Sequence, residues 1–134
     1  KMRQDRIGFL DDFGKTFFGE TMFHKPLSFQ LMDYFRMICS MASPRATTEC
    51  AKAFSSTDFR EEMKTVIVPT LIIHGDDDKT VPFEITGKLA ASAIPGSKLI
   101  VYEGSPHGLF YTEKHRLNDD ILDFIEGGPI GKSH

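Results

Sequence analysis

Residues 70–82 read TLIIHGDDDKTVP, an apolar run that stops at Gly75 and opens into a loop with three acidic side chains. Short apolar runs bounded by turn residues are typical of buried parallel strands, and open α/β sheets assemble their chemistry at the carboxyl ends of such strands. The pattern recurs at residues 98–102, which are followed by EGSPHG at residues 103–108. We therefore expect an acidic loop and a histidine loop at the ends of two neighbouring strands.

The chain is predicted to have two parts. Residues 1–65 form a helical segment, and residues 66–134 carry the two strands with their helices. Hydrophobic residues at helical spacing predict a first helix within residues 1–18, interrupted at Gly14 and ended by Gly19.

Serines mark the expected starts of the next helices. Ser28 is a predicted N-cap for residues 29–38, which are apolar on more than one face and therefore need cover on two sides. Ser43, followed by Pro44, is the typical opening of a third helix. Thr57 is expected to cap a last short turn.

The strands are predicted to pair in parallel. Pro69 marks the start of the first strand, and a helix over about residues 84–93 supplies the right-handed crossover that parallel pairing requires. An amphipathic stripe over residues 117–125 predicts a last helix, stopped at Gly127. The final residues have the character of a frayed tail.

Composition indicates an ordinary globular chain. It has 134 residues, of which 40% are hydrophobic and 26% charged, and a formal net charge of -3, so it has no basic footprint for nucleic acid. No apolar run approaches the ~18 residues of a membrane span, and the first residues do not form a secretory signal. We expect a cytoplasmic protein without a membrane partner.

No metal site is expected. Cys39 and Cys50 lie in helical patterns without metal-binding spacing, which favours small buried hydrophobic residues over a disulfide or a zinc site. The acidic loop lacks the spacing of a calcium-binding EF-hand, because its sixth position is not glycine and Glu84 comes too early.

The two loops predict an acid–base pair. If the strands are neighbours, their ends lie roughly 5 Å apart, and Asp78 reaches His107. The carboxylate would then fix the imidazole tautomer and stabilise the imidazolium that forms when the base takes a proton. Asp77 is expected to be exposed, and Asp76 to shape the turn through its own backbone. For His74 we favour a core hydrogen bond.

A nucleophile is missing from the chain. No G-x-S-x-G pattern occurs, Ser97 lacks the flanking glycines, and Ser105 precedes a proline that removes a backbone donor. In this architecture the serine precedes both the acid and the histidine. The remaining histidines are expected to be structural; they are His24, His115 and His134.

Several motifs carry a family resemblance. They are DFR at 58–60, VPTLIIHGD at 68–76, Asp78, VPFE at 81–84, TGK at 86–88, PHG at 106–108 and LND at 117–119. They closely resemble the cofactor-free bacterial haloperoxidase, aryl esterase and perhydrolase family of the α/β-hydrolase fold. The match is dense from about Cys50 to Ile125, and the first 45 residues resemble that family's helical cap.

The resemblance implies roles for individual residues. By position, Asp78 is the triad acid and His107 the triad base. Phe83 falls on the acyl pocket, and Thr80 stands in the pocket wall where a larger apolar residue is common. The family is a serine hydrolase family that acts on small carboxylic esters through an acyl-enzyme, with perhydrolase and haloperoxidase side activity. No haem, metal or flavin is implied.

The resemblance also implies that this is the C-terminal half of such an enzyme. The family's nucleophile serine, its oxyanion-hole amides and most of its central sheet have no counterpart here. The expected partners are a small ester or carboxylic acid substrate and either the missing N-terminal half or further copies of the chain.

A non-catalytic product is the alternative. A truncated or split-gene chain would survive by pairing with a separate chain that carries the missing N-terminal half, or by oligomerising. On either reading, the isolated chain is expected to be inactive. A two-stranded parallel sheet with an open edge also predicts that a lone monomer is marginally stable.

Overall fold

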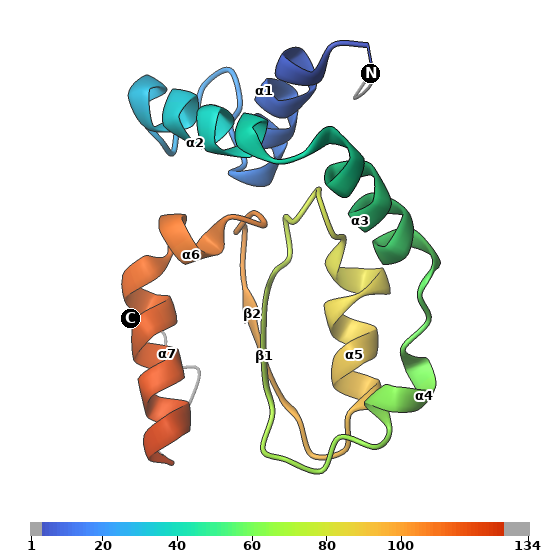
Figure 1. Cartoon of the computed structure of the whole chain (residues 1–134). Helices are drawn as coiled ribbons and strands as arrows, with labels where there is room; N and C mark the ends of the chain where they lie inside the picture. Colours follow the sequence, from blue (N-terminus) through green and yellow to red (C-terminus); the bar gives the residue numbers. More distant parts are fainter. Residues whose placement is uncertain (1–3, 128–134) are drawn as a thin grey trace.

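The computed structural model describes residues 4–127. The elements follow in the order α1 (Arg6–Phe17), α2 (Phe29–Met41), α3 (Pro44–Ser56), α4 (Arg60–Met63), β1 (Leu71–Gly75), η1 (Phe83–Ile85), α5 (Gly87–Ala93), β2 (Lys98–Tyr102), α6 (Leu109–Thr112) and α7 (Lys114–Glu126). Four helices thus precede a two-stranded sheet that is flanked by helices (Figure 1). The predicted α/β class is confirmed.

The strands pair in parallel, as predicted. Leu71 lies opposite Lys98, and Gly75 lies opposite Tyr102. The short helix α5 lies in the crossover between the strands, and Figure 1 shows α5 and α7 on opposite sides of the sheet. Both strands therefore end at the same edge, where the acidic and histidine loops begin.

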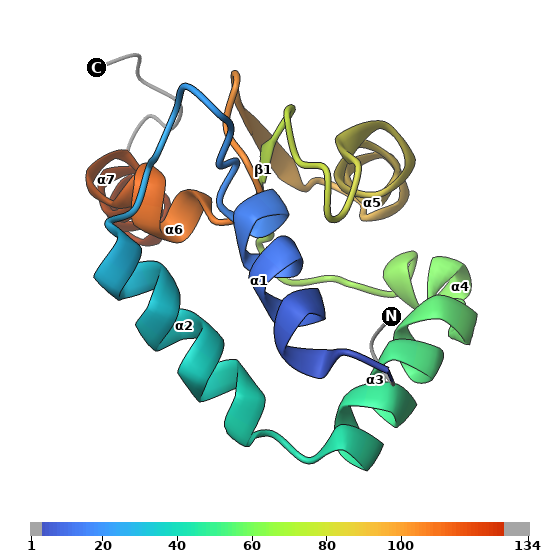
Figure 2. The same cartoon turned by 90° about the horizontal axis from the view of Figure 1, so that it is seen from above.

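The first helices lie over that edge. Both views place α1 above the carboxyl ends of the strands, with α2 alongside it (Figures 1 and 2). The buried hydrophobic residues come from this region and from β2; they are Leu10, Phe18, Leu27, Ile100 and Tyr102. The core therefore joins the helical segment to the loop side of the sheet.

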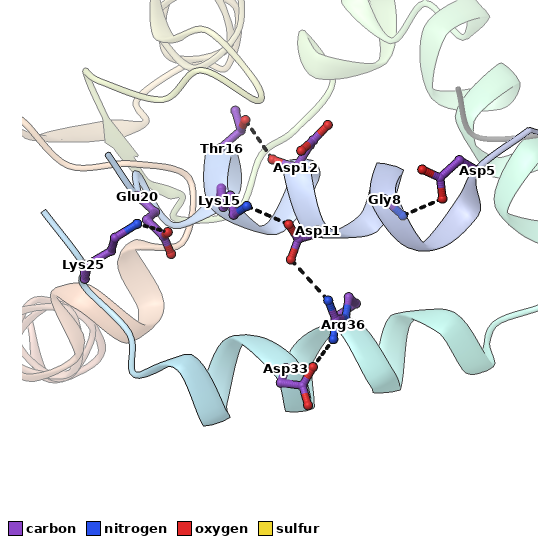
Figure 3. A network of polar contacts seen from close by, with 10 residues as sticks. All are labelled: Asp5, Gly8, Asp11, Asp12, Lys15, Thr16, Glu20, Lys25, Asp33 and Arg36. Carbon is purple, nitrogen blue, oxygen red and sulfur yellow. Dashed lines mark hydrogen bonds and ion pairs between the residues drawn. The ribbon is translucent and has the colours of Figure 1, made fainter. Parts of the chain in front are cut away.

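A polar network holds α1 and α2 together at their surface (Figure 3). Asp11 accepts from Lys15 at 2.6 Å and from Arg36 of α2 at 3.4 Å, and Arg36 also pairs with Asp33. Because these side chains are one third to one half exposed to solvent, each ion pair contributes little stability, about 0–1 kcal/mol. The α1–α2 contact depends mainly on packed aromatic side chains, such as Phe17 and Phe18 on Phe35.

Two expectations about the helices were wrong, at Gly14 and at Thr57. Gly14 does not interrupt α1, because it is buried against α2, where an added Cβ would lie 3.1 Å from Met32 Cε. Helix α2 has no buried residue, so the cover that its apolar faces were predicted to need does not come from residues 4–127. Thr57 does not cap α4; its hydroxyl donates to the Ala53 carbonyl at the end of α3.

The predicted caps at Ser28 and Ser43 are confirmed, since their hydroxyls accept from the amides of Leu31 and Ala46. Helix α7 ends at Gly127 in the left-handed conformation, also as predicted.

The cysteine prediction was right about the free thiols and wrong about burial. Both cysteines are free, but Cys39 of α2 is only half-buried and Cys50 of α3 is exposed, because neither helix has a buried residue among those described. The predicted frayed tail and His134 lie outside the described residues. Within residues 4–127, no helix is long and apolar enough to cross a membrane.

Candidate active site

The acidic and histidine loops are held against each other at the end of the sheet. A Cβ at Gly75 would lie 2.1 Å from the Ser105 carbonyl oxygen, so only glycine permits this approach. The same carbonyl accepts from the amide of Asp77 at 3.2 Å. Asp76 contributes differently from the prediction, because its Oδ1 accepts from the amide of Gly104 at 2.6 Å and so joins the two loops. Asp77 is exposed, as expected.

Asp78 is the buried acid of the site, with 5% of its surface exposed. Its Oδ1 accepts from the backbone amides of Thr80 at 2.8 Å and Val81 at 2.7 Å. Its Oδ2 lies 2.6 Å from His107 Nδ1 and 3.2 Å from His74 Nε2. The predicted hydrogen bond between Asp78 and His107 is confirmed, and Asp78 is the acid that makes it.

The contact fixes the tautomer of the His107 ring. Because a carboxylate only accepts, the proton between Asp78 Oδ2 and His107 Nδ1 belongs to the imidazole. In the neutral ring, Nε2 of His107 therefore keeps its lone pair and is able to take a proton. The arrangement is that of an orienting carboxylate and a general base.

Helix α1 covers one side of the histidine. The Phe17 ring packs edge-on to His107 with centroids 4.6 Å apart, and the Phe17 carbonyl accepts from the amide of Gly108 at 2.7 Å. The His107 side chain is still 34% exposed. A hollow of about 160 Å³ opens beside it, lined by Ile73, His74, Asp78, His107, Leu109 and Phe110. A reacting group thus has access to the ring.

The two expected pocket residues lie outside this hollow. Thr80 lines a separate surface hollow with Phe9 and Phe13 of α1. Phe83 packs on the His74 ring, with centroids 5.5 Å apart. Their role in substrate binding stays a prediction.

His74 makes the core hydrogen bond that the sequence favoured, since its Nε2 lies 2.9 Å from the Val81 carbonyl oxygen. Its contact with Asp78 and the packing of Phe17 on His107 were not predicted from the sequence. The phenylalanine spacing in the first helix indicated only a packing surface.

A second buried pair anchors the strand that leads to His107. The Tyr102 hydroxyl donates to Asp120 of α7 at 2.5 Å, and the Arg116 guanidinium lies 3.8 Å from the centre of the tyrosine ring. Burial, and then the hydrogen bond to Asp120, raise the pKa of Tyr102 above its ordinary value. Tyr102 thereby fixes the end of β2 against α7.

Several known proteins are similar to this chain in sequence and structure. The bifunctional esterase/perhydrolase DCH of Acinetobacter calcoaceticus is 48% identical over 85 residues, covering 63% of this chain. The AB hydrolase superfamily protein YisY of Bacillus subtilis is 35% identical over 122 residues, 91% of this chain. The solved bromoperoxidase from Bacillus anthracis superimposes with a TM-score of 0.87 at 44% identity over 93% of this chain. The chain belongs to the α/β-hydrolase family.

The chain covers less than half the length of these relatives. This α/β-hydrolase chain spans 31% of the Acinetobacter protein, 43% of the Bacillus subtilis protein and 45% of the bromoperoxidase. The matching region is the C-terminal part of the curated relatives. No protein-family model matches the chain. We call the remainder of such a relative, ahead of the matching region, the front half.

Proposed function

We propose that this chain supplies the acid and the base of a serine hydrolase that cleaves small carboxylic esters. The observation that carries the proposal is the 2.6 Å contact between Asp78 Oδ2 and His107 Nδ1, next to a hollow that reaches the imidazole. The similarity to the Acinetobacter esterase/perhydrolase supports the substrate class. The expected serine comes from a front half.

In the proposed reaction, the serine oxygen attacks the ester carbonyl while His107 Nε2 takes the serine proton. The resulting imidazolium is stabilised by Asp78 and passes that proton to the departing alkoxide, leaving an acyl-enzyme. A water molecule then attacks the acyl group as His107 accepts its proton, and the acid is released when that proton returns to the serine. Hydrogen peroxide in place of water gives a peracid, the proposed perhydrolase side activity.

The free edge of β1 indicates where a front half would pair. The amide of Lys98 donates to the Thr70 carbonyl and that of Asp76 to the Tyr102 carbonyl, so alternate residues of β1 turn their peptide groups towards β2. The peptide groups of Leu71 and Ile73 therefore face the other edge, where the part of the chain that the structure describes has no strand. We propose that a front-half strand pairs there and brings the serine to the loop side.

The test is a chimera in which residues 1–134 replace the matching part of the Bacillus anthracis bromoperoxidase. The chimera should hydrolyse an aryl acetate, and His107→Ala should lower kcat by about 10³-fold or more, as loss of a triad base does. Asp78→Asn should act in the same way, because an amide in its place favours the wrong tautomer. The matched controls His115→Ala and Asp77→Asn should change kcat little. Equal losses for His107→Ala and His115→Ala would show that the base is assigned wrongly.

A further inference from the structure

Two imidazoles meet at one oxygen of the buried acid. Oδ2 of Asp78 lies 2.6 Å from His107 Nδ1 and 3.2 Å from His74 Nε2, and the His74 side chain is only 13% exposed. The other oxygen is occupied by two backbone amides, at 2.7 Å and 2.8 Å. A carboxylate offers about four acceptor directions, so all of them are used.

The protonation of His74 is set by its neighbours. Its Nε2 faces the Val81 carbonyl oxygen at 2.9 Å and Asp78 Oδ2 at 3.2 Å, and both groups only accept. Nε2 therefore carries a proton and shares it between the two oxygens. Because Asp78 and Val81 stand at either end of the short turn 78–81, one ring at the end of β1 holds both ends of that turn.

The position of the His74 ring is set by Gly87, at the start of α5. A Cβ on residue 87 would lie 2.4 Å from His74 Nδ1, a distance that side-chain carbons do not tolerate. The ring also packs on Phe83, with centroids 5.5 Å apart. The ring is therefore confined to the orientation that aims Nε2 at Asp78.

We propose that His74 is a positioning residue for the acid–base pair. It donates its Nε2 proton to Asp78 Oδ2 and to the Val81 carbonyl, and so holds the carboxylate in the orientation that receives the Nδ1 proton of His107. His74 itself transfers no proton and touches no substrate. This inference rests on the proposed function for its effect on rate, but its effect on the tautomer of His107 is independent of any activity.

The test compares three side chains at position 74. His74→Phe keeps a planar ring and removes the donor, whereas His74→Gln keeps an N–H near the place of Nε2. In the chimera, His74→Phe should lower kcat by about 10- to 100-fold with little change in KM, which is the scale of a lost hydrogen bond to a charged group. His74→Gln should recover most of that loss.

The second readout is the ring of His107 in the ¹⁵N-labelled 134-residue chain. At a pH where the ring is neutral, long-range ¹H–¹⁵N correlations should show one tautomer with the proton on Nδ1. His74→Phe should give a mixture of tautomers, and His74→Gln should restore the single form. A wild-type chimera without esterase activity would count against the proposed function, and this spectrum would still decide the role of His74.

Gly87→Ala serves where His74→Phe does not fold, because it displaces the His74 ring without changing its chemistry. It should produce the same mixture of tautomers and add little to the effect of His74→Gln. Ser92→Ala, at an exposed position of the same helix, is the control. The inference is overturned if His74→Phe or Gly87→Ala leaves the His107 spectrum unchanged, or if His74→Gln behaves like His74→Phe.

Discussion

The loop side of the sheet is well buried by residues of this chain, whereas the helices α2 and α3 are not. Asp78, Tyr102 and Ser105 are 5%, 0% and 3% exposed, and the loops are joined by hydrogen bonds. Helices α2 and α3 bury no residue, and Phe29 and Phe54 are 77% and 74% exposed. Residues of this chain alone thus hold Asp78 and His107 in place. The apolar faces of α2 and α3 are left exposed, as expected of surfaces that pack against another polypeptide.

A phenylalanine-to-alanine substitution should therefore be costly at the loop side of the sheet and nearly neutral in α3. Phe18→Ala should cost about 3–5 kcal/mol of unfolding free energy, because Phe18 is 3% exposed and packs on Phe35 and Phe110. Phe54→Ala, at an exposed site of α3, should change that free energy by less than about 0.5 kcal/mol. Chemical denaturation of the 134-residue chain, followed by circular dichroism, measures both. Similar costs at the two positions would mean that α3 is packed in solution.

A smaller effect is expected at the tyrosine that anchors β2. Tyr102→Phe should lower the free energy of unfolding by about 1.5–3 kcal/mol, because it removes the hydroxyl that donates to Asp120. This is the range for a hydrogen bond to a charged group, and the same chemical denaturation measures it.

The pH dependence of stability tests the same contact. Because burial and Asp120 raise the pKa of Tyr102, the folded state keeps the phenol protonated more firmly than the unfolded state does. The stability contributed by the protonated phenol is fully present below pH 10.0, the ordinary pKa of tyrosine, and is lost as the pH rises further. Chemical denaturation at a series of pH values from 8 to 11 should show a falling free energy of unfolding, and this fall should be smaller in Tyr102→Phe. An identical decline in the variant would rule out this assignment.

The sequence predicted the pairing of Asp78 with His107 because parallel strands of known order place their following loops together. It did not predict that His74 shares the same carboxylate oxygen, since that contact depends on the path of the turn from Asp78 to Val81. The contact of Phe17 with His107 was equally hidden, because it depends on where α1 docks. Both contacts join residues whose relative position depends on the tertiary structure, and a local sequence pattern does not predict that position.

The errors at Gly14 and Cys50 have a related physical cause. A glycine inside a helical pattern reads as a break, but here it lets α2 approach α1 closely. An apolar or thiol side chain in a helical pattern reads as buried, but the covering surface for α3 is not found among residues 4–127. Spacing along the chain predicts which face is apolar and not what covers it.

The proposed function assigns the acid and the base of an esterase to this chain and the nucleophile to a front half. A serine-directed fluorophosphonate probe tests it most directly, on the isolated 134-residue chain and on the chimera with the bromoperoxidase front half. We expect no covalent labelling of the isolated chain, labelling of the chimera at a front-half serine, and loss of that labelling in His107→Ala. Stoichiometric labelling of the pure 134-residue chain would contradict the account.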